Sequence, residues 1–128
     1  MKINIKATGI ELTQAISDYV YKRIFSIGKY LDQKNNPDIV AQVEVGRSTR
    51  HHKAGNIFRA EIHIMGTNLD AYAVSEMEDL YAAIDIVKDE IVRNIVHLKG
   101  KRETLSRRGA GIMKNIMNGI ISSFKKRK

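Results

Sequence analysis

The stretch IFRAEIHIMGTNLDAYAV, residues 57–74, decides the fold because it predicts a β-hairpin. Apolar and polar residues alternate over residues 57–65, which is typical of a half-buried strand. Gly66-Thr67-Asn68 has the composition of a tight turn, and residues 69–74 predict the returning strand. The apolar side chains that share one face of the first strand, and therefore predict its buried side, are Phe58, Ala60, Ile62 and Ile64.

Two more strands are expected before the hairpin. Residues 39–45 and residues 2–8 alternate in the same way, whereas residues 46–55 have the composition of a polar, basic loop. Three consecutive strands with short connections predict an antiparallel meander. Because the chain opens on a strand pattern instead of a basic segment and a long apolar run, we expect no N-terminal signal.

Two amphipathic helices are predicted around these strands. The first spans residues 13–31, with Thr13 as the N-cap. The second follows Ser75 and Glu78, which have the spacing of a capping box, and is expected to end at Gly100. Its apolar positions recur at steps of three and four residues: Leu80, Ile84, Val87, Ile91, Ile95 and Leu98.

The order β-α-β-β-β-α predicts an α+β domain of two layers, in which a four-stranded sheet carries both helices on one face. We expect this domain to span residues 1–102 and residues 103–128 to form a basic, amphipathic C-terminal tail. The other sheet face is expected to be polar, with Lys2, Asn4, Lys6, Gln42, Glu44, Arg59, Glu61 and His63.

The charge is distributed unevenly along the chain. The formal net charge is +8, yet acids and bases balance over residues 1–100. Residues 101–128 carry nine bases and one acid, so the whole excess lies in the tail. A compact domain with a basic arm is a common design among proteins that bind polyanions.

Several classes of protein are excluded or disfavoured. The chain has no cysteine, which excludes a disulfide framework, a thiolate zinc site and a thiol nucleophile. His51 and His52 are adjacent but lack further ligands at metal-binding spacing, and Gly109 and Gly111 predict a flexible joint instead of a phosphate cradle. We therefore expect no enzyme, no cofactor, no metal and no small-molecule substrate.

Basic residues gather in a few places, and this favours nucleic acid. Singly, each is equally an ordinary surface charge, but clustered bases attract phosphates. The candidate contacts are Lys22 and Lys29 on the first helix, Lys88, Arg93 and Lys99 on the second, Arg47, Arg50, His51, His52 and Lys53 in the loop, and Lys101 and Arg102 at the start of the tail. Aromatic residues are scarce, with no paired stacking motif on a strand, so folded, double-helical RNA is favoured over stacked single strands.

The tail carries a second pattern, an apolar stripe that predicts a short helix. Its residues are Ile112, Met113, Ile116, Met117, Ile120, Ile121 and Phe124, followed by Lys125-Lys126-Arg127-Lys128. Three alternatives remain open: the helix packs on the domain or a partner, it folds only on its target, or it lies on an anionic membrane. Membrane contact is the least favoured of the three. No apolar run approaches the roughly 20 residues of a membrane span, so we expect a cytoplasmic protein.

The segment Glu78-Asp79-Leu80-Tyr81-Ala82-Ala83-Ile84-Asp85 resembles the second-helix motif of the ribosome hibernation-promoting factor family, also called ribosome-associated inhibitor A. The opening strand, the helix after Leu12-Thr13 and the Phe58-Arg59-Ala60-Glu61 strand are also similar to that family, and the resemblance covers about residues 1–102. We identify the chain as a short-form member, because the residues after 102 are too few for the second domain of the long forms.

The resemblance implies a fold like that of a double-stranded-RNA-binding domain. It also implies binding to the small ribosomal subunit and its rRNA, in the mRNA channel and across the tRNA decoding sites. By matching positions, Arg23, Lys29, Arg93, Lys99 and Lys101 fall where the family places bases that face rRNA. The chain departs from the family at Glu90, Val96 and His97, where bases are frequent, and Lys88 is a partial substitute.

We therefore expect a ribosome hibernation factor that inhibits translation sterically, competes with mRNA and tRNA, preserves idle ribosomes and is a monomer off the ribosome. The alternative is a general module that binds structured RNA or assists ribosome assembly away from the mature ribosome.

Overall fold

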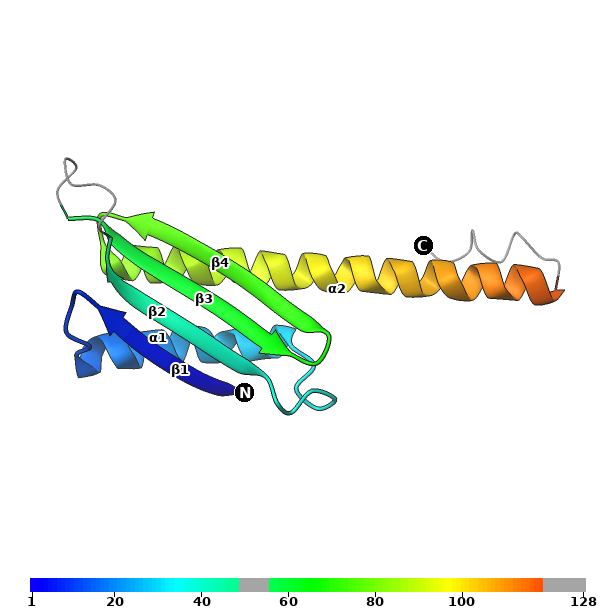
Figure 1. Ribbon diagram of the computed structural model, residues 1–128, viewed down its shortest axis with the longest axis horizontal. Coiled ribbons are helices and arrows are strands. Elements are labelled where there is room, and N and C mark those ends of the chain that lie inside the picture. The colour runs from blue at the N-terminus through cyan, green and yellow to red at the C-terminus, as the bar shows by residue number, and fades with distance from the viewer. Residues whose placement is uncertain (49–55, 119–128) are drawn as a thin grey trace. The chain divides into compact units, whose positions relative to one another are not determined.

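The computed structural model describes residues 1–48 and 56–118, with side chains up to residue 100. The elements in chain order are β1 (Lys2–Thr8), α1 (Gln14–Phe25), the 3₁₀ helix η1 (Ser26–Tyr30), β2 (Val40–Arg47), β3 (Phe58–Gly66), β4 (Leu69–Met77) and α2 (Leu80–Asn118). The strands form one sheet in the order β1-β2-β3-β4 (Figure 1). This arrangement confirms the predicted α+β class and the four-stranded sheet.

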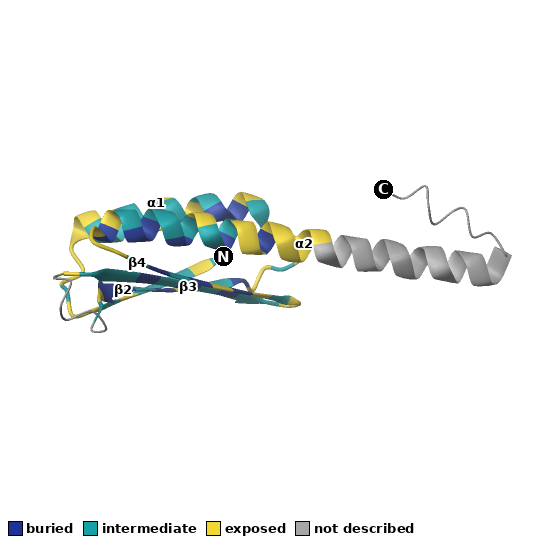
Figure 2. Cartoon of the chain, turned by 90° about the horizontal axis from the view of Figure 1, so that it is seen from above, coloured by how far each residue is buried: buried dark blue, intermediate teal, exposed yellow. Residues whose placement is uncertain are grey.

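Both helices cover the same face of the sheet, as Figure 2 shows for α1 and the first turns of α2. The core between the two layers is aliphatic: Val20 and Ile24 of α1, Ile62 of β3, and Ile84 and Ile91 of α2 are at most 1% exposed. Removing this apolar surface from water is the main stabilising contribution to the fold. The alternation predicted for the third strand is confirmed, since Ala60, Ile62 and Ile64 are all buried.

The sheet is mixed. β2, β3 and β4 pair antiparallel, as predicted for the meander, whereas β1 pairs parallel with β2. The connection between β3 and β4 has only two residues, Thr67 and Asn68, and Asn68 has a left-handed φ of 57°. Asparagine tolerates this conformation better than most residues. The side chain of Asn36 fixes the turn, because its Nδ2 donates to the Thr67 carbonyl at 2.9 Å and its Oδ1 accepts from the Thr67 amide at 3.2 Å.

The first helix begins as predicted and then changes type. The Thr13 hydroxyl accepts a hydrogen bond from the Ile16 amide at 3.2 Å, which confirms Thr13 as the N-cap. The α-helix ends at Phe25, and η1 continues the turn to Tyr30. Serine often competes with the helical hydrogen-bond pattern, and here the Ser26 hydroxyl donates to the Arg23 carbonyl at 2.6 Å.

The predicted start of the second helix is wrong. Ser75 is not a capping residue but a buried member of β4, and its hydroxyl donates to the Ala83 carbonyl at 2.6 Å. It continues the inward-facing series of Ala71 and Ala73, so sheet pairing overrides the local capping pattern. The cap is supplied instead by Asp79, whose carboxylate accepts from the Ala82 amide at 3.1 Å.

The predicted end of the second helix is also wrong. α2 passes through Gly100, Gly109 and Gly111 and reaches Asn118, so the expected joint and the separate tail helix are parts of one helix. A glycine costs a helix only about 1 kcal/mol relative to alanine, and the neighbouring Lys99, Lys101 and Arg102 are good helix formers. The stripe residues Ile120, Ile121 and Phe124 and the terminal Lys125-Lys126-Arg127-Lys128 lie outside the described residues.

By its internal contacts the chain forms two compact units, Met1–Ile95 and Val96–Lys128. The expected division at residue 102 stays a prediction. In the part of the chain that the structure describes, no helix combines the length and the apolar composition that crossing a membrane requires.

Candidate nucleic-acid interface

The candidate bases of the first unit are carried mainly by the helical layer. Lys22 and Arg23 lie on α1, Lys29 lies on η1, and Lys88 and Arg93 lie on α2. The helix phase explains this placement, because the buried positions of both helices are aliphatic and the remaining positions face solvent. We call the solvent-facing side of α1, η1 and residues 80–95 of α2 the helical surface.

One of these bases is used to join the two helices. The Arg23 Nε lies 3.0 Å from Asp85 Oδ1, and Arg23 Nη2 donates to the Tyr19 hydroxyl at 3.1 Å. The Tyr19 hydroxyl in turn donates to Asp85 Oδ1 at 2.6 Å, and its ring meets the Tyr81 ring edge to face at 4.8 Å. Arg23 is therefore bonded to two partners, although its side chain is 43% exposed.

The electrostatics of this junction follow from its contacts. The hydrogen bond to Asp85 raises the pKa of the Tyr19 hydroxyl above its usual value, so the hydroxyl stays protonated and keeps donating. Its contacts with Tyr19 and Asp85 also raise the pKa of Arg23, which keeps the guanidinium charged. Arg23 thus has a structural role that its position in the sequence did not reveal.

Three bases of the helical surface have no such partner. Lys22, Lys29 and Arg93 are exposed and make no ion pair within the residues whose side chains the structure describes. The Lys29 ammonium lies 5.2 Å from the centroid of the Tyr30 ring, which holds it on η1. These three side chains can exchange solvent for phosphate without breaking a protein ion pair.

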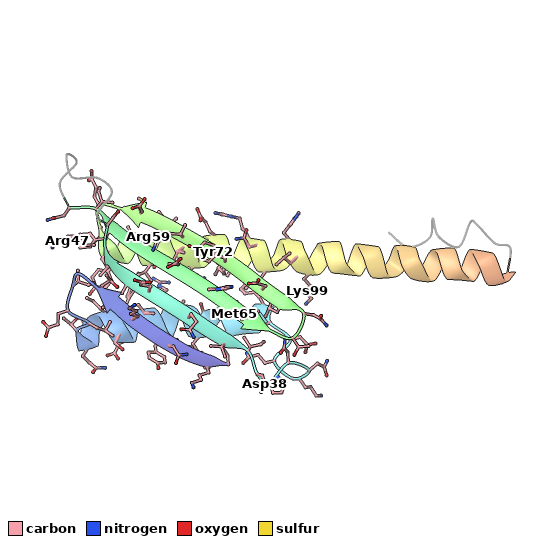
Figure 3. The ribbon with its side chains drawn as sticks, in the orientation of Figure 1. Asp38, Arg47, Arg59, Met65, Tyr72 and Lys99 are labelled. Atoms are coloured by element: carbon pink, nitrogen blue, oxygen red, sulfur yellow. The ribbon has the colours of Figure 1, made fainter. Side chains whose placement is uncertain are left out.

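Lys88 and Arg47 are intermediate between the bonded Arg23 and the unpaired bases, because each has one weaker contact. The Lys88 side chain is only 21% exposed, and its ammonium lies 3.8 Å from the Asp89 carboxylate. Arg47 is exposed at the end of β2, with its guanidinium 5.9 Å from the centroid of the Phe58 ring. Figure 3 shows Arg47 at the opposite end of the sheet from Met65.

The remaining candidates are placed only in part. Lys99 is exposed on α2, in the second unit of the chain. The predicted contacts whose side chains lie outside the described residues are Arg50, His51, His52, Lys53, Lys101 and Arg102.

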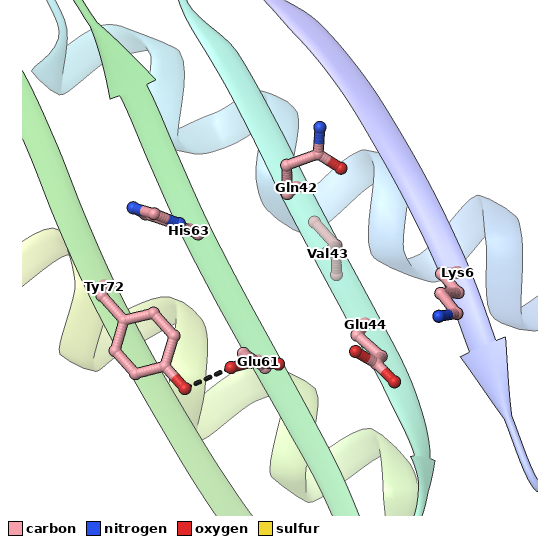
Figure 4. A pocket seen from close by; sticks show the side chains of 7 residues that line it. All are labelled: Lys6, Gln42, Val43, Glu44, Glu61, His63 and Tyr72. Atoms are coloured by element: carbon pink, nitrogen blue, oxygen red, sulfur yellow. Dashed lines mark hydrogen bonds between the residues drawn. The ribbon is translucent and has the colours of Figure 1, made fainter.

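The open face of the sheet has a different electrostatic character. The Arg59 guanidinium pairs with the Glu61 carboxylate at 3.2 Å, and the Tyr72 hydroxyl donates to the same carboxylate (Figure 4). His63 Nε2 lies 2.5 Å from the Asp70 carboxylate, and the Thr8 hydroxyl donates to Glu44 at 2.7 Å. Bases and carboxylates are therefore interspersed on this face.

Two carboxylates of the open face stand directly opposite each other, because Glu44 and Glu61 are register partners on β2 and β3. With Lys6, Gln42, His63 and Tyr72 they line a shallow hollow of about 210 Å³. The hydrogen bond from Tyr72 lowers the pKa of Glu61, so this carboxylate stays ionised at neutral pH. Because these carboxylates lie among the bases of the open face, the unpaired bases of the helical surface are the better candidates for binding a polyanion.

Among the described residues, no three or more histidine, aspartate or glutamate side chains are arranged to hold a metal ion. The helical surface offers charged side chains and a surface shape for the recognition of a polyanion.

Comparison with known proteins identifies similar chains. A family model, described as Sigma 54 modulation protein / S30EA ribosomal protein, matches residues 3–103. The ribosome hibernation promoting factor of Escherichia coli (strain K12) is 30% identical over 101 residues, which cover 79% of this chain and 96% of that protein. The factor of the same name from Azotobacter vinelandii is 29% identical over 102 residues, with 80% and 86% covered.

Solved structures agree with these sequence matches. The N-terminal domain of Thermus thermophilus Protein Y superposes with a TM-score of 0.61 at 30% identity, covering 74% of this chain and 96% of that one. A ribosomal subunit interface protein from Coxiella burnetii gives a TM-score of 0.63 over 78% and 99% of the two chains. Its identity is 12%, so this second likeness supports the fold alone.

Proposed function

The chain belongs to the family described as Sigma 54 modulation protein / S30EA ribosomal protein, and on that premise we propose that it is a ribosome hibernation factor. The observation that carries the proposal is the family match over residues 3–103, which includes all of the sheet except Lys2 and both helices of the first unit. The similar proteins named ribosome hibernation promoting factor support the same role. They are named as factors and not as enzymes, which agrees with the expectation of a non-enzymatic protein.

The proposed partner is the small ribosomal subunit with its rRNA. Lys22, Lys29 and Arg93 of the helical surface bind rRNA phosphates, and Arg47 of the first unit and Lys99 of the second unit are further contacts. Each phosphate contact releases condensed counterions, so affinity falls steeply as salt rises. Residues 1–102 supply the folded body in this proposal, and the bases of residues 103–128 increase the encounter rate.

The proposed mechanism is steric. A folded domain bound in the mRNA channel and across the tRNA decoding sites occupies the path of both ligands, so translation stops while the subunit stays intact. No group of this chain needs to change covalently in such a mechanism. The site of action is the cytoplasm, where the ribosomes are.

Sedimentation with purified small subunits at increasing salt tests the proposal. We expect the protein to sediment with the subunits at low salt and to be released as salt rises. Added mRNA and initiator tRNA are expected to displace it. Failure to sediment even at low salt overturns the proposal, and sedimentation without competition favours the alternative of an RNA-binding module that acts away from the decoding sites.

A further inference from the structure

The most exposed large apolar side chain of the described residues is Phe25, the last residue of α1, which is 76% exposed. Tyr21 lies one turn earlier on the same side of the helix and is 47% exposed. Phenylalanine is usually buried, because its ring carries a large apolar surface and no polar group. Two exposed aromatic rings in one helical stripe therefore indicate a surface with a binding role.

The position of Phe25 is fixed by the helix phase. Val20, Ile24 and Ile27 occupy the inward positions and are fully buried, so the Phe25 ring has no place in the core. The Tyr21 hydroxyl lies 3.4 Å from the Ile3 carbonyl of the edge strand β1, which ties this side of α1 to the sheet. The ring is thus presented by a rigid element, on the layer that Figure 2 shows above the sheet.

The charged residues within four positions of Phe25 in the sequence are all basic. Lys22 precedes the ring by three residues, which places it on the adjoining side of the same turn, and Lys29 follows on η1. Both lysines are exposed and belong to the helical surface. An aromatic ring with lysines on both sides has the chemistry that binds a nucleotide, because bases stack on the ring while ammonium groups contact the neighbouring phosphates.

We infer that Phe25 is a stacking platform for an unpaired base of the bound RNA, with Lys22 and Lys29 on the flanking phosphates. The inference rests on the proposed function, which it deepens by assigning to the helical surface a contact with a nucleobase of the RNA. It also departs from the expectation that stacking is disfavoured, which rested on the scarcity of aromatic residues and on the lack of a paired stacking motif on a strand.

Tyr72 is an exposed aromatic residue of the open face, and its surroundings differ from those of Phe25. Its side chain is 46% exposed, but its hydroxyl is bonded to Glu61, and Glu44 lines the same hollow. A nucleobase stacked on Tyr72 brings the phosphates of its nucleotide towards the Glu44 and Glu61 carboxylates. Tyr72 is therefore the matched control for Phe25.

Fluorescence provides a direct test, because the chain has no tryptophan and F25W introduces a single reporter. We expect the emission of F25W to be quenched when small ribosomal subunits are added, and also by a short single-stranded adenine oligonucleotide at low salt. The control Y72W is expected to keep its emission in both titrations. Unchanged F25W emission with bound subunits overturns the inference.

An affinity series separates stacking from simple apolar contact. F25Y and F25W keep an aromatic face and are expected to bind small subunits like the wild type, whereas F25L and F25A are expected to bind about tenfold more weakly, the scale of one base stack. If F25L binds as tightly as the wild type, the inference fails: a loss in F25A alone then indicates an apolar contact, and no loss in F25A indicates no contact of the ring. Thermal unfolding of each variant confirms that the exposed substitution leaves the fold intact.

The two proposals fail differently. If the wild type does not sediment with small subunits, the proposed function is wrong, and the oligonucleotide titration alone decides the stacking contact. If the wild type sediments and F25L matches it, the proposed function stands and the stacking contact is rejected.

Discussion

The helical surface and the open sheet face both carry bases, yet they differ in what surrounds those bases. On the open face Arg59 is paired with Glu61, and Lys6 lies opposite Glu44 in the strand register. On the helical surface Lys22 and Arg93 make no ion pair with any residue whose side chain the structure describes. The difference teaches that the pairing of each base with a carboxylate, and not the number of bases alone, has to be examined when a candidate polyanion surface is chosen.

The two surfaces differ for a geometric reason. In a sheet, neighbouring strands place side chains about 5 Å apart on a fixed lattice, so a base on one strand easily meets an acid on the next. On a helix surface the long lysine and arginine side chains extend into solvent, and a partner one turn away brings only a small gain. Asp89 and Glu90 lie within one turn of Arg93 without pairing with it.

Reversing charges on each surface gives the largest expected effect. The double variant K22E/R93E is expected to weaken binding to small subunits about a hundredfold near physiological salt and to reduce the salt dependence by about two phosphate contacts. The matched control K2E/K6E changes the net charge equally on the open face. It is expected to weaken binding less than about threefold, because screening limits distant charges to a range of about 8 Å. Sedimentation at several salt concentrations measures both.

Equal losses in the two double variants contradict the comparison. They show that binding depends on net charge and that neither surface is specific.

Much of the fold could be predicted from the sequence, because the buried apolar residues recur at a fixed spacing along each strand and helix. The alternation of Ala60, Ile62 and Ile64 and the helical spacing of Ile84 and Ile91 predicted the buried faces that the structure confirms. The errors arose where a local signal competes with a larger one. Ser75 has a capping pattern but occupies a buried strand position, and a single glycine at residue 100 is too weak to end α2.

The candidate site was less accessible to sequence analysis. Base clusters located the helices and the loop, but the pairing state of each base depends on tertiary contacts. Tyr19 and Arg23 have the spacing of helix neighbours, which is a detectable signal. Their shared acceptor Asp85 lies 66 positions beyond Tyr19, and one sequence contains no sign of that contact.

The Arg23 junction provides the next test of the comparison, because there a base of the helical layer does have a carboxylate partner. D85A removes the acceptor of both Tyr19 and Arg23, and we expect the midpoint of thermal unfolding to fall by about 5 °C. D89A, which removes an exposed carboxylate 3.8 Å from Lys88, is expected to change it by less than about 1 °C. Subunit binding of folded D85A is expected to persist, since the substitution removes a negative charge from the surface.

A tenfold loss of binding in folded D85A contradicts that expectation. It shows that the junction holds Arg23 in place for a phosphate and that pairing does not remove a base from the interface.

The open face offers a smaller, pH-dependent effect. Because Glu61 has a lowered pKa in the folded protein, its contribution to stability is present above the unfolded pKa of about 4.3 and is lost as pH falls through the folded value. E61Q is expected to lower the unfolding midpoint by about 3 °C at pH 7 and to reduce the loss of stability on acidification. Subunit binding is expected to be unchanged. Thermal unfolding across pH 3–7 measures the first effect, and weaker binding of E61Q contradicts the separation of the two surfaces.

The smallest expected effect comes from Tyr72, the other partner of Glu61. Y72F removes the hydroxyl that donates to this carboxylate but keeps the ring, which meets His63 edge to face at 5.8 Å. Because the side chain is half-exposed, water replaces the lost donor, and we expect the unfolding midpoint to fall by about 1 °C. Because the Tyr72 hydrogen bond is the main cause of the lowered Glu61 pKa, Y72F is expected to remove most of the acid-dependent stability of Glu61, and the part supplied by Arg59 is expected to fall only when R59M is added. If the acid dependence of stability in Y72F equals that of the wild type, the tyrosine does not lower the pKa of Glu61, and the contact with Arg59 does so instead.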